Sequence, residues 1–232
     1  EMLRNSQIGP YVFPIPSEFT NWRDEQEAWQ NTVVLMDLSY HMTDIYFEGP
    51  DVYRLLSDIG VNSFRNFEPN RTKQFVACNY DGYVIGDAIL FHHAENKISI
   101  VGRPSAQNWV AFHAETGDYD VEVTRDERSV SNDKPRFTYR YQIQGPNAEK
   151  VLEKVNGGRL PDVKFFHMCE FMIAGRTVRA LNHGMSRTNG LELWGPYGEG
   201  KEVKAALLQA GKEFGLRQVG SRAYSTVSIE SG

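Results

Sequence analysis

The sequence predicts an α+β protein whose sheets are largely antiparallel and flanked by helices. The first observation is a short unit that recurs along the chain: a strand, a Gly-Pro turn and a helix with an apolar stripe. The second is the larger number of alternating, strand-like segments that lie between these units. Several strands for each helix, in β-α-β-β order, are typical of this fold class.

The recurring unit is clearest in "IYFEGPDVYRLLSDIG", residues 45–60. A strand comes first, a Gly-Pro pair follows, and apolar side chains then recur at helical spacing. Residues 141–158, "YQIQGPNAEKVLEKVNGG", repeat the pattern and end near Gly157, a common helix stop. A looser copy occupies residues 190–211, with its helix beginning near Lys201. Because proline near the first helical turn costs no hydrogen bond, each copy predicts a strand, a turn and a helix.

Strands are predicted in the alternating segments. These segments are "YVIGDAILF" (83–91), "KISIV" (97–101), "YDVEV" (119–123), "RFTYRYQI" (136–143) and "TVRALN" (177–182). A last strand is expected in "VGSRAYSTVSIESG" (219–232), with Tyr224 on its polar face. The polar, charged segment 124–135 is the best candidate for a boundary between two related α+β halves, 1–125 and 135–232.

Composition limits the class of protein. The chain has 232 residues, 41% hydrophobic and 24% charged, as in globular domains. It contains no apolar run of the about 18 residues that a membrane span needs, and no export signal opens it. The net charge of −5 disfavours a nucleic-acid surface. Cys78 and Cys169 lack metal-ligand spacing and read as reduced core residues, so a soluble cytoplasmic protein is expected.

Asp87 and Arg103 are candidates for binding residues. Asp87 has apolar neighbours in "GYVIGDAILF", so its carboxylate needs a partner, either in a turn of the chain or on a polar ligand. Arg103 follows a glycine at the end of an apolar strand in "ISIVGRPSAQNW". A guanidinium there suits the carboxylate of an anionic substrate and equally suits a surface ion pair.

Two more polar residues accompany apolar strands. His41 follows "TVVLMDLSY", where a hydrogen-bonded core histidine is more common than a catalytic one. Glu192 alternates with leucines in "NGLELWGP". It is either a simple outward-facing strand residue or an acid that holds the amide edge of a flat heterocycle. His92 and His93 lack the carboxylate or cysteine spacing of a zinc site.

Several of these stretches together resemble the aminomethyltransferase family, the folate-dependent T-protein of glycine cleavage and its relatives. "VVLMDLSYHM" is similar to the family's "V-x-x-D-x-S-H-M" strand, and "YQIQGP" to its "Q-G-P" turn. "GYVIGDAILF" is similar to "G-x-x-x-D-D", with Gly86 in place of the first Asp and Asp87 matching the second. "VGSRAYSTVSIESG" is similar to "G-x-R-D-x-L-R-L-E-A-G". The order and separation of the four motifs agree across nearly the whole chain.

Further stretches resemble one branch of that family. "VGRPSAQNW", "LELWGPY" and "QAGKEFGL" are similar to the tetrahydrofolate-dependent aryl methyl ether O-demethylases, which act on vanillate, syringate and 3-O-methylgallate during lignin breakdown. The resemblance implies two intertwined α+β domains and a third, C-terminal domain that is missing from this chain. It also implies tetrahydrofolate as the methyl acceptor, a small aromatic acid as the substrate, and no metal.

The resemblance assigns roles to individual residues. Asp87 and Glu192 match positions that line the folate site, Asp87 near N5 and Glu192 at the donor edge of the pterin. Arg103 matches the arginine that binds the carboxylate of the aromatic acid. His41 and Tyr224 match the polar pair beside the ether oxygen.

The implied chemistry gives Tyr224 the central role. An aryl methyl ether is inert because phenoxide leaves poorly, so methyl transfer needs a donor to the departing oxygen. A phenol with a pKa of about 10 matches the acidity of the departing phenol, so Tyr224 is expected to be the acid, supported by His41. Phe13 and Leu38 match positions that are Tyr and Gln in vanillate-type enzymes. Apolar residues there favour syringate, with its second methoxy group, over vanillate or 3-O-methylgallate.

Two other readings remain open. One is an aminomethyltransferase like the T-protein, whose lipoyl-protein partner would call for a basic docking face. The other is a folate-binding protein without turnover, whose relatives carry a reactive cysteine in a "K-G-C-Y-x-G-Q-E"-like motif. Neither Cys78 nor Cys169 lies in such a motif.

Overall fold

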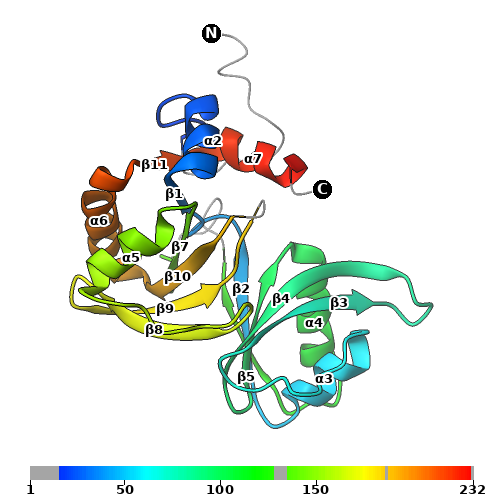
Figure 1. The fold of residues 1–232 in the computed structure, drawn as a ribbon. Helices are drawn as coiled ribbons and strands as arrows, with labels where there is room; N and C mark the ends of the chain where they lie inside the picture. The colour runs from blue at the N-terminus through cyan, green and yellow to red at the C-terminus, as the bar shows by residue number, and fades with distance from the viewer. Residues whose placement is uncertain (1–15, 128–134, 186–187, 231–232) are drawn as a thin grey trace. The chain divides into compact units, whose positions relative to one another are not determined.

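The computed structural model describes residues 16–127, 135–185 and 188–230 (Figure 1). Contacts within the chain divide it into two compact units. The first unit comprises Glu1–His41, Thr138–Pro161 and Glu170–Gly232, and the second comprises Met42–Phe137 and Asp162–Cys169. Among the helices of these described ranges, none is long and apolar enough to cross a membrane.

The first unit is built on a six-stranded mixed sheet with the strand order β11-β1-β7-β10-β9-β8. Its strands are β1 (Val33–Asp37), β7 (Thr138–Gln144), β8 (Met168–Ile173), β9 (Arg176–Asn182), β10 (Gly190–Pro196) and β11 (Leu216–Val219). Its helices are α2 (Trp22–Asn31), α5 (Ala148–Asn156), α6 (Gly200–Gly211) and α7 (Ser221–Glu230). Strand β1 runs parallel to β11 and antiparallel to β7, and β10 is antiparallel to both β7 and β9.

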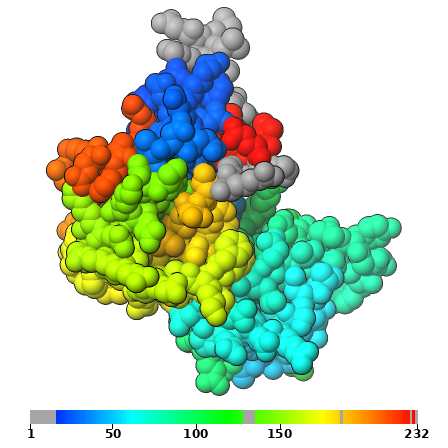
Figure 2. Space-filling model, in the orientation of Figure 1, coloured from blue at the N-terminus to red at the C-terminus, as the bar shows by residue number. Residues whose placement is uncertain are grey.

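The two faces of this sheet differ in character. One face carries fully buried apolar residues such as Ile143 and Leu193, and helix α6 packs on it. On the other face Met36 of β1 and Val219 of β11 pack in an apolar cluster with Ala223 and Val227 of α7 and with residues of α2. Helices α2 and α7 lie side by side on the surface, as the blue and red residues in Figure 2 show. Further along this second face, β7 and β10 carry the polar side chains of the candidate site.

The second unit contains a five-stranded antiparallel sheet with the order β3-β4-β5-β2-β6. Its strands are β2 (Thr43–Glu48), β3 (Thr72–Cys78), β4 (Val84–Ala94), β5 (Lys97–Gly102) and β6 (Glu122–Asp126), and its helices are α3 (Val52–Ile59) and α4 (Pro104–Thr116). Both helices cover one face of this sheet. Their apolar residues form a single buried cluster with alternate residues of the strands, including Phe47, Phe75 and Leu90.

The helices and strands of the recurring units are confirmed. The apolar stripes predicted after the Gly-Pro turns are the buried faces of α3 and α5, and α6 begins one residue before Lys201. Gly157 follows α5 in the left-handed conformation, with φ of 75°, as expected of a glycine stop. The alternating segments correspond to β4, β5, β6, β7 and β9, so the α+β class with mainly antiparallel pairing is also confirmed.

The strand expected across residues 219–232 is wrong. Strand β11 ends at Val219, and Ser221–Glu230 form helix α7 instead. Ala223, Tyr224 and Val227 all join the apolar cluster that includes residues of α2, whereas a strand would direct the adjacent residues 223 and 224 to opposite faces. The hydroxyl of Ser225 donates to the carbonyl of Ser221 within the same helix. Tyr224 therefore projects from a helix.

Two other expectations need comment. Within the described residues Cys78 and Cys169 form no disulfide, and they are half-buried rather than core residues. The sequence placed residues 1–41 in a first half of the chain, whereas their contacts group them with Thr138–Pro161 and Glu170–Gly232. The boundary segment 124–135 lies partly outside the described residues, and the division into repeated halves stays a prediction.

Candidate functional site

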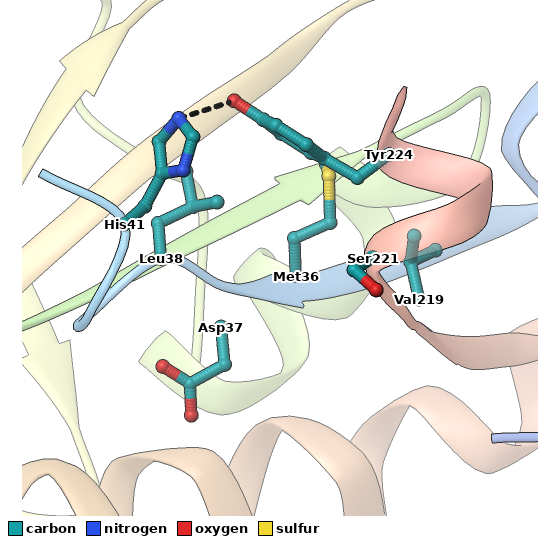
Figure 3. Close-up of a pocket in the computed structure, with 7 residues that line it drawn as sticks. All are labelled: Met36, Asp37, Leu38, His41, Val219, Ser221 and Tyr224. Carbon is teal, nitrogen blue, oxygen red and sulfur yellow. Dashed lines mark hydrogen bonds between the residues drawn. The ribbon is translucent and has the colours of Figure 1, made fainter. Parts of the chain in front are cut away.

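His41 and Tyr224 form the centre of the candidate site in the first unit (Figure 3). The phenolic oxygen of Tyr224 lies 3.2 Å from Nε2 of His41, and the two rings meet edge to face with centroids 5.0 Å apart. Met36, Leu38, Val219 and Ser221 line the same small pocket, together with Asp37. Figure 3 shows the carboxylate of Asp37 directed away from the His41–Tyr224 pair.

The surroundings of Tyr224 change its acidity. Burial, and to a smaller extent the negative charge of Glu192, together raise the pKa of Tyr224 to about 12. Tyr224 as a whole is half-buried, and its hydroxyl group faces His41 within the pocket. The phenol therefore stays protonated at every pH at which the protein is expected to work.

The loop that carries His41 is fixed to strand β7. The main-chain N–H of Leu38 donates to the carbonyl of Arg140 over 2.8 Å. The buried hydroxyl of Ser39 accepts from the N–H of Arg140 at 3.0 Å and donates to its carbonyl at 3.3 Å. Asp37 accepts from the N–H of Ser39 at 3.1 Å. Because buried main-chain groups need partners, these bonds set the path of the loop into His41.

Glu192 is a buried residue of this unit, only 7% exposed. Its Oε1 contacts the guanidinium of Arg140 from the neighbouring strand β7. Its Oε2 lies 4.0 Å from Nδ1 of His183. The interpretation of Glu192 as an outward-facing strand residue is therefore wrong, because this face of the sheet is covered and holds a line of polar groups.

Sequence reasoning missed three residues of this region: Ser39, Arg140 and Gln142. Gln142 is fully buried and lies directly opposite Glu192 in the β7–β10 register. Its Nε2 donates to the carbonyl of His183 at 3.0 Å, while its Oε1 has no hydrogen-bond partner among the described residues. The signal was present in "YRYQIQ", where polar residues at every second position alternate with Tyr and Ile.

Asp87 does not lie in an apolar environment. It is exposed on β4 of the second unit, and its Oδ2 accepts from the Nε2 of Gln74 on β3 at 2.7 Å. Its apolar sequence neighbours point to the other face of the sheet: Ala88 is buried in the core of this unit. The expectation that Asp87 is enclosed by apolar residues is therefore wrong, because strand alternation directs the adjacent Ala88 to the other face, and its role toward a ligand stays a prediction.

Arg103 also belongs to the second unit. It is exposed at the N-cap position of α4, directly after β5, as the strand-end expectation required. Within the described residues its side chain forms no ion pair, so the interpretation as a surface ion pair finds no support. Phe13 lies outside the described residues. The structure thus brings Leu38, His41 and Tyr224 to one pocket, with the charge of Glu192 acting on Tyr224.

The histidines of β4 have protein partners. His92 lies 2.9 Å from the hydroxyl of Tyr53, and burial lowers its pKa. Nε2 of His93 lies 2.7 Å from the hydroxyl of Ser99. In the part of the chain that the structure describes, no group of three His, Cys, Asp or Glu side chains is arranged to hold a metal ion.

The fold first defines a class of protein. Aminomethyltransferase T of the glycine cleavage system from Bartonella henselae is similar in structure, with a TM-score of 0.77 at 20% identity, over 98% of this chain and 59% of that one. A heterotetrameric sarcosine oxidase from Corynebacterium sp. U-96 is similar with a TM-score of 0.55 at 14% identity, over 85% of this chain and 94% of that one. Both likenesses concern the fold alone.

Residues 8–232 match the family model described as the GCVT N-terminal domain, and the chain belongs to that family. Among curated relatives, syringate O-demethylase of Sphingobium sp. (strain NBRC 103272 / SYK-6) is 50% identical, over 100% of this chain and 51% of its own length. An aminomethyltransferase of Clostridium botulinum (strain Okra / Type B1) is 26% identical, over 94% of this chain and 58% of its own. The chain thus spans about half the length of the curated relatives it matches.

Proposed function

We propose that the protein transfers a methoxy methyl group from a lignin-derived aromatic acid to N5 of tetrahydrofolate, giving a phenol. The observation that carries the proposal is the half-buried His41–Tyr224 pair at a pocket that Leu38 also lines. The 50% identity to a syringate O-demethylase supports the same reaction type. An aminomethyl reaction would have no evident use for a phenol that is held protonated in this way.

Tyr224 acts as a hydrogen-bond donor to the departing ether oxygen. The expected match between two phenols with pKa values of about 10 does not hold, because burial raises the pKa of Tyr224 to about 12. Complete proton transfer to a phenoxide is then uphill. A strong hydrogen bond in a water-poor site still stabilises the charge that develops as the methyl group leaves.

His41 orients that donor. When the proton of the imidazole is on Nε2, His41 donates to the phenolic oxygen of Tyr224 across the 3.2 Å contact. The hydrogen of the phenol is then directed toward the substrate. His41 works through Tyr224 in this scheme and needs no change of charge.

Substrate recognition is assigned to three residues that the resemblance singles out. Arg103, exposed and without an ion-pair partner among the described residues, binds the carboxylate of the aromatic acid. Leu38 and Phe13 provide apolar surface toward a second methoxy group, so syringate is favoured over vanillate. A clear preference for vanillate in catalytic efficiency would contradict this assignment.

The residues present fit the pterin of tetrahydrofolate. Its amide and amino groups offer N–H donors, and the carboxylate of Glu192 together with the unpartnered Oε1 of the buried Gln142 offers acceptors on one face of the sheet. Tetrahydrofolate supplies the nucleophilic nitrogen that accepts the methyl group. Asp87 is proposed to face that nitrogen, and its exposure leaves the carboxylate accessible.

The proposed function is tested with the intact protein, tetrahydrofolate under anaerobic conditions, and syringate or vanillate in separate reactions. Mass spectrometry should detect 5-methyltetrahydrofolate and the matching demethylated phenol. Tyr224→Phe should abolish both products, whereas Tyr197→Phe, which removes a hydroxyl bonded to Tyr40, should not. Folate binding without methyl transfer from either acid would refute the demethylase and favour an aminomethyltransferase or a non-catalytic folate-binding protein.

A further inference from the structure

We propose that Arg140 is a positioning residue of the candidate site. Its guanidinium keeps the carboxylate of Glu192 ionised and in place, and its main chain holds the loop that carries His41. The part of this inference that makes Glu192 a ligand-binding group rests on the proposed function. The electrostatic coupling between Arg140 and Glu192 does not.

The first support is the burial of the pair. Arg140 is 6% exposed and Glu192 7%, and the guanidinium of Arg140 contacts Oε1 of Glu192. A buried carboxylate without a cationic partner is strongly disfavoured and takes up a proton instead. The charge of Glu192, which acts on Tyr224, is therefore maintained by Arg140.

The second support is the position of Arg140 in strand β7. Its N–H and carbonyl bond to Leu38 and Ser39, which directly follow β1, and Ser39 is two residues before His41. One residue thus reaches the His41 loop through its main chain and Glu192 through its side chain. A change in the side chain alone can separate these two contributions.

The charged and titratable groups around Glu192 come from other parts of this unit. Arg140 lies on β7, His183 follows β9 with Nδ1 at 4.0 Å from Oε2, and Tyr224 projects from α7. Arg179 on β9 is the next cation, but it pairs with Glu170 at 3.3 Å. Arg140 and Arg179 lie 5.5 Å and 5.7 Å from the centre of the same Trp194 ring. Arg179 is therefore a matched control that leaves the partner of Glu192 intact.

The first experiment needs neither substrate nor folate. Urea unfolding midpoints of the intact protein would be measured between about pH 5 and about pH 8 for the wild type, Arg140→Gln, Glu192→Gln, the double variant and Arg179→Gln. In the Arg140→Gln variant, the carboxylate of Glu192 has lost its cation and should bind a proton more tightly in the folded state than in the unfolded state. The unfolding equilibrium constant of Arg140→Gln, divided by that of the double variant, should therefore rise by up to about tenfold per pH unit as the pH increases.

The controls set what would overturn the proposal. Arg179→Gln and Arg140→Lys should keep the pH dependence of the wild type, because both leave a cation beside Glu192. If Arg140→Gln folds poorly, Glu192→Gln should restore folding in the double variant by removing the uncompensated carboxylate. Parallel pH dependences for Arg140→Gln and the double variant, or a double variant no more stable than Arg140→Gln, would overturn the proposal.

A second readout connects Arg140 to the proposed function. In Arg140→Gln, kcat/KM for methyl transfer should fall by about tenfold per pH unit on the acidic side, and Arg140→Lys should restore most of it. If the wild type transfers no methyl group but the urea result holds, the proposed function fails and the coupling stands. If Arg140→Gln transfers the methyl group with the same dependence of kcat/KM on pH as the wild type, the positioning role of Arg140 is wrong and the proposed function still stands.

Discussion

Tyr224 and Glu192 show how burial sets the chemistry of single residues in this protein. The phenol is held protonated because its hydroxyl is surrounded by protein and because a carboxylate lies nearby. The carboxylate persists beside it because Arg140 contacts it. The protonation of Tyr224 therefore depends on the charge of Glu192, and that charge depends on Arg140.

The raised pKa of Tyr224 predicts a specific loss of stability in alkali. The folded protein holds the phenolic proton more tightly than the unfolded chain, so this contribution is full below about pH 10 and is lost as the pH rises through about 12. The free energy of unfolding of the wild type should therefore decline by about 2–3 kcal/mol over that window through this group. Tyr224→Phe should remove this part of the decline in urea titrations.

The control for this prediction is Tyr80→Phe, because Tyr80 is 87% exposed and its ring should matter little to folding. Its unfolding should follow the alkaline dependence of the wild type. An identical decline for Tyr224→Phe and the wild type would show that the hydroxyl of Tyr224 is not buried in solution.

Single residues were predictable from the sequence only where their position did not depend on a distant strand. Arg103 follows a strand as expected, since the end of β5 and the start of α4 place it locally. Asp87 and Glu192 look alike in sequence, each a lone acid among apolar neighbours, yet one is exposed and the other buried. The difference lies in which face of each sheet is covered, and that depends on elements far away in the chain.

At the level of elements, the end of β1, the adjoining loop and α7 bring His41 to Tyr224. The loop is held by its bonds to β7, and α7 is held by the apolar contacts of Ala223 and Val227. The strand predicted in place of α7 shows that the spacing of polar and apolar residues does not always distinguish a strand from a helix. The polar and apolar residues of that segment alternate well enough for a strand, and the cluster with α2 selects the helix.

Ser39→Ala is predicted to destabilise the protein by about 1–3 kcal/mol, because it leaves the buried N–H of Arg140 without its partner. It should also lower methyl transfer more than folate binding, since the loop into His41 loses its anchor. Ser225→Ala removes an exposed hydroxyl within α7 and should be nearly neutral. Equal unfolding free energies for the two variants would contradict the anchoring role of Ser39.

Gly220→Ala is predicted to disturb the start of α7. A Cβ at Gly220 would lie 2.3 Å from the main-chain oxygen of Ser17, so the backbone has to move, at a cost of about 1–3 kcal/mol. At Gly158 no heavy atom of the described chain lies within 4 Å of such a Cβ. Gly158→Ala should therefore leave the urea midpoint nearly unchanged. A Gly220→Ala variant as stable as Gly158→Ala would argue against this close approach.

For the whole molecule, each unit has its own sheet and its own buried ion pairs between arginine and acidic side chains. In the second unit, Arg136 is buried between Asp44 at 2.6 Å and Asp126 at 3.1 Å. Its Nη1 also donates to the carbonyl of Met42 at 2.7 Å. Strands β2, β4 and β5 and helix α3 of this unit were predicted from local patterns. The joining of residues 1–41 to much later segments was not, because it depends on β1 pairing with β7 and β11.

Arg136→Met is predicted to destabilise the protein by about 3–5 kcal/mol, because it leaves two buried carboxylates without their cation. Arg125→Gln breaks a partly exposed pair with Glu127 and should cost less than about 1 kcal/mol. Urea unfolding of the intact variants measures both. A small effect of Arg136→Met would mean that the buried cluster contributes little to the second unit.

The central claim is that Tyr224 assists the departure of an aryl oxygen while a methyl group moves to tetrahydrofolate. The most direct test is a single-turnover reaction of the intact protein with syringate carrying ¹³C in its methoxy groups, followed by mass spectrometry of the folate. The account predicts labelled 5-methyltetrahydrofolate with the wild type and a rate at least about 100-fold lower with Tyr224→Phe. Unlabelled folate with the wild type, or equal rates for both proteins, would contradict it.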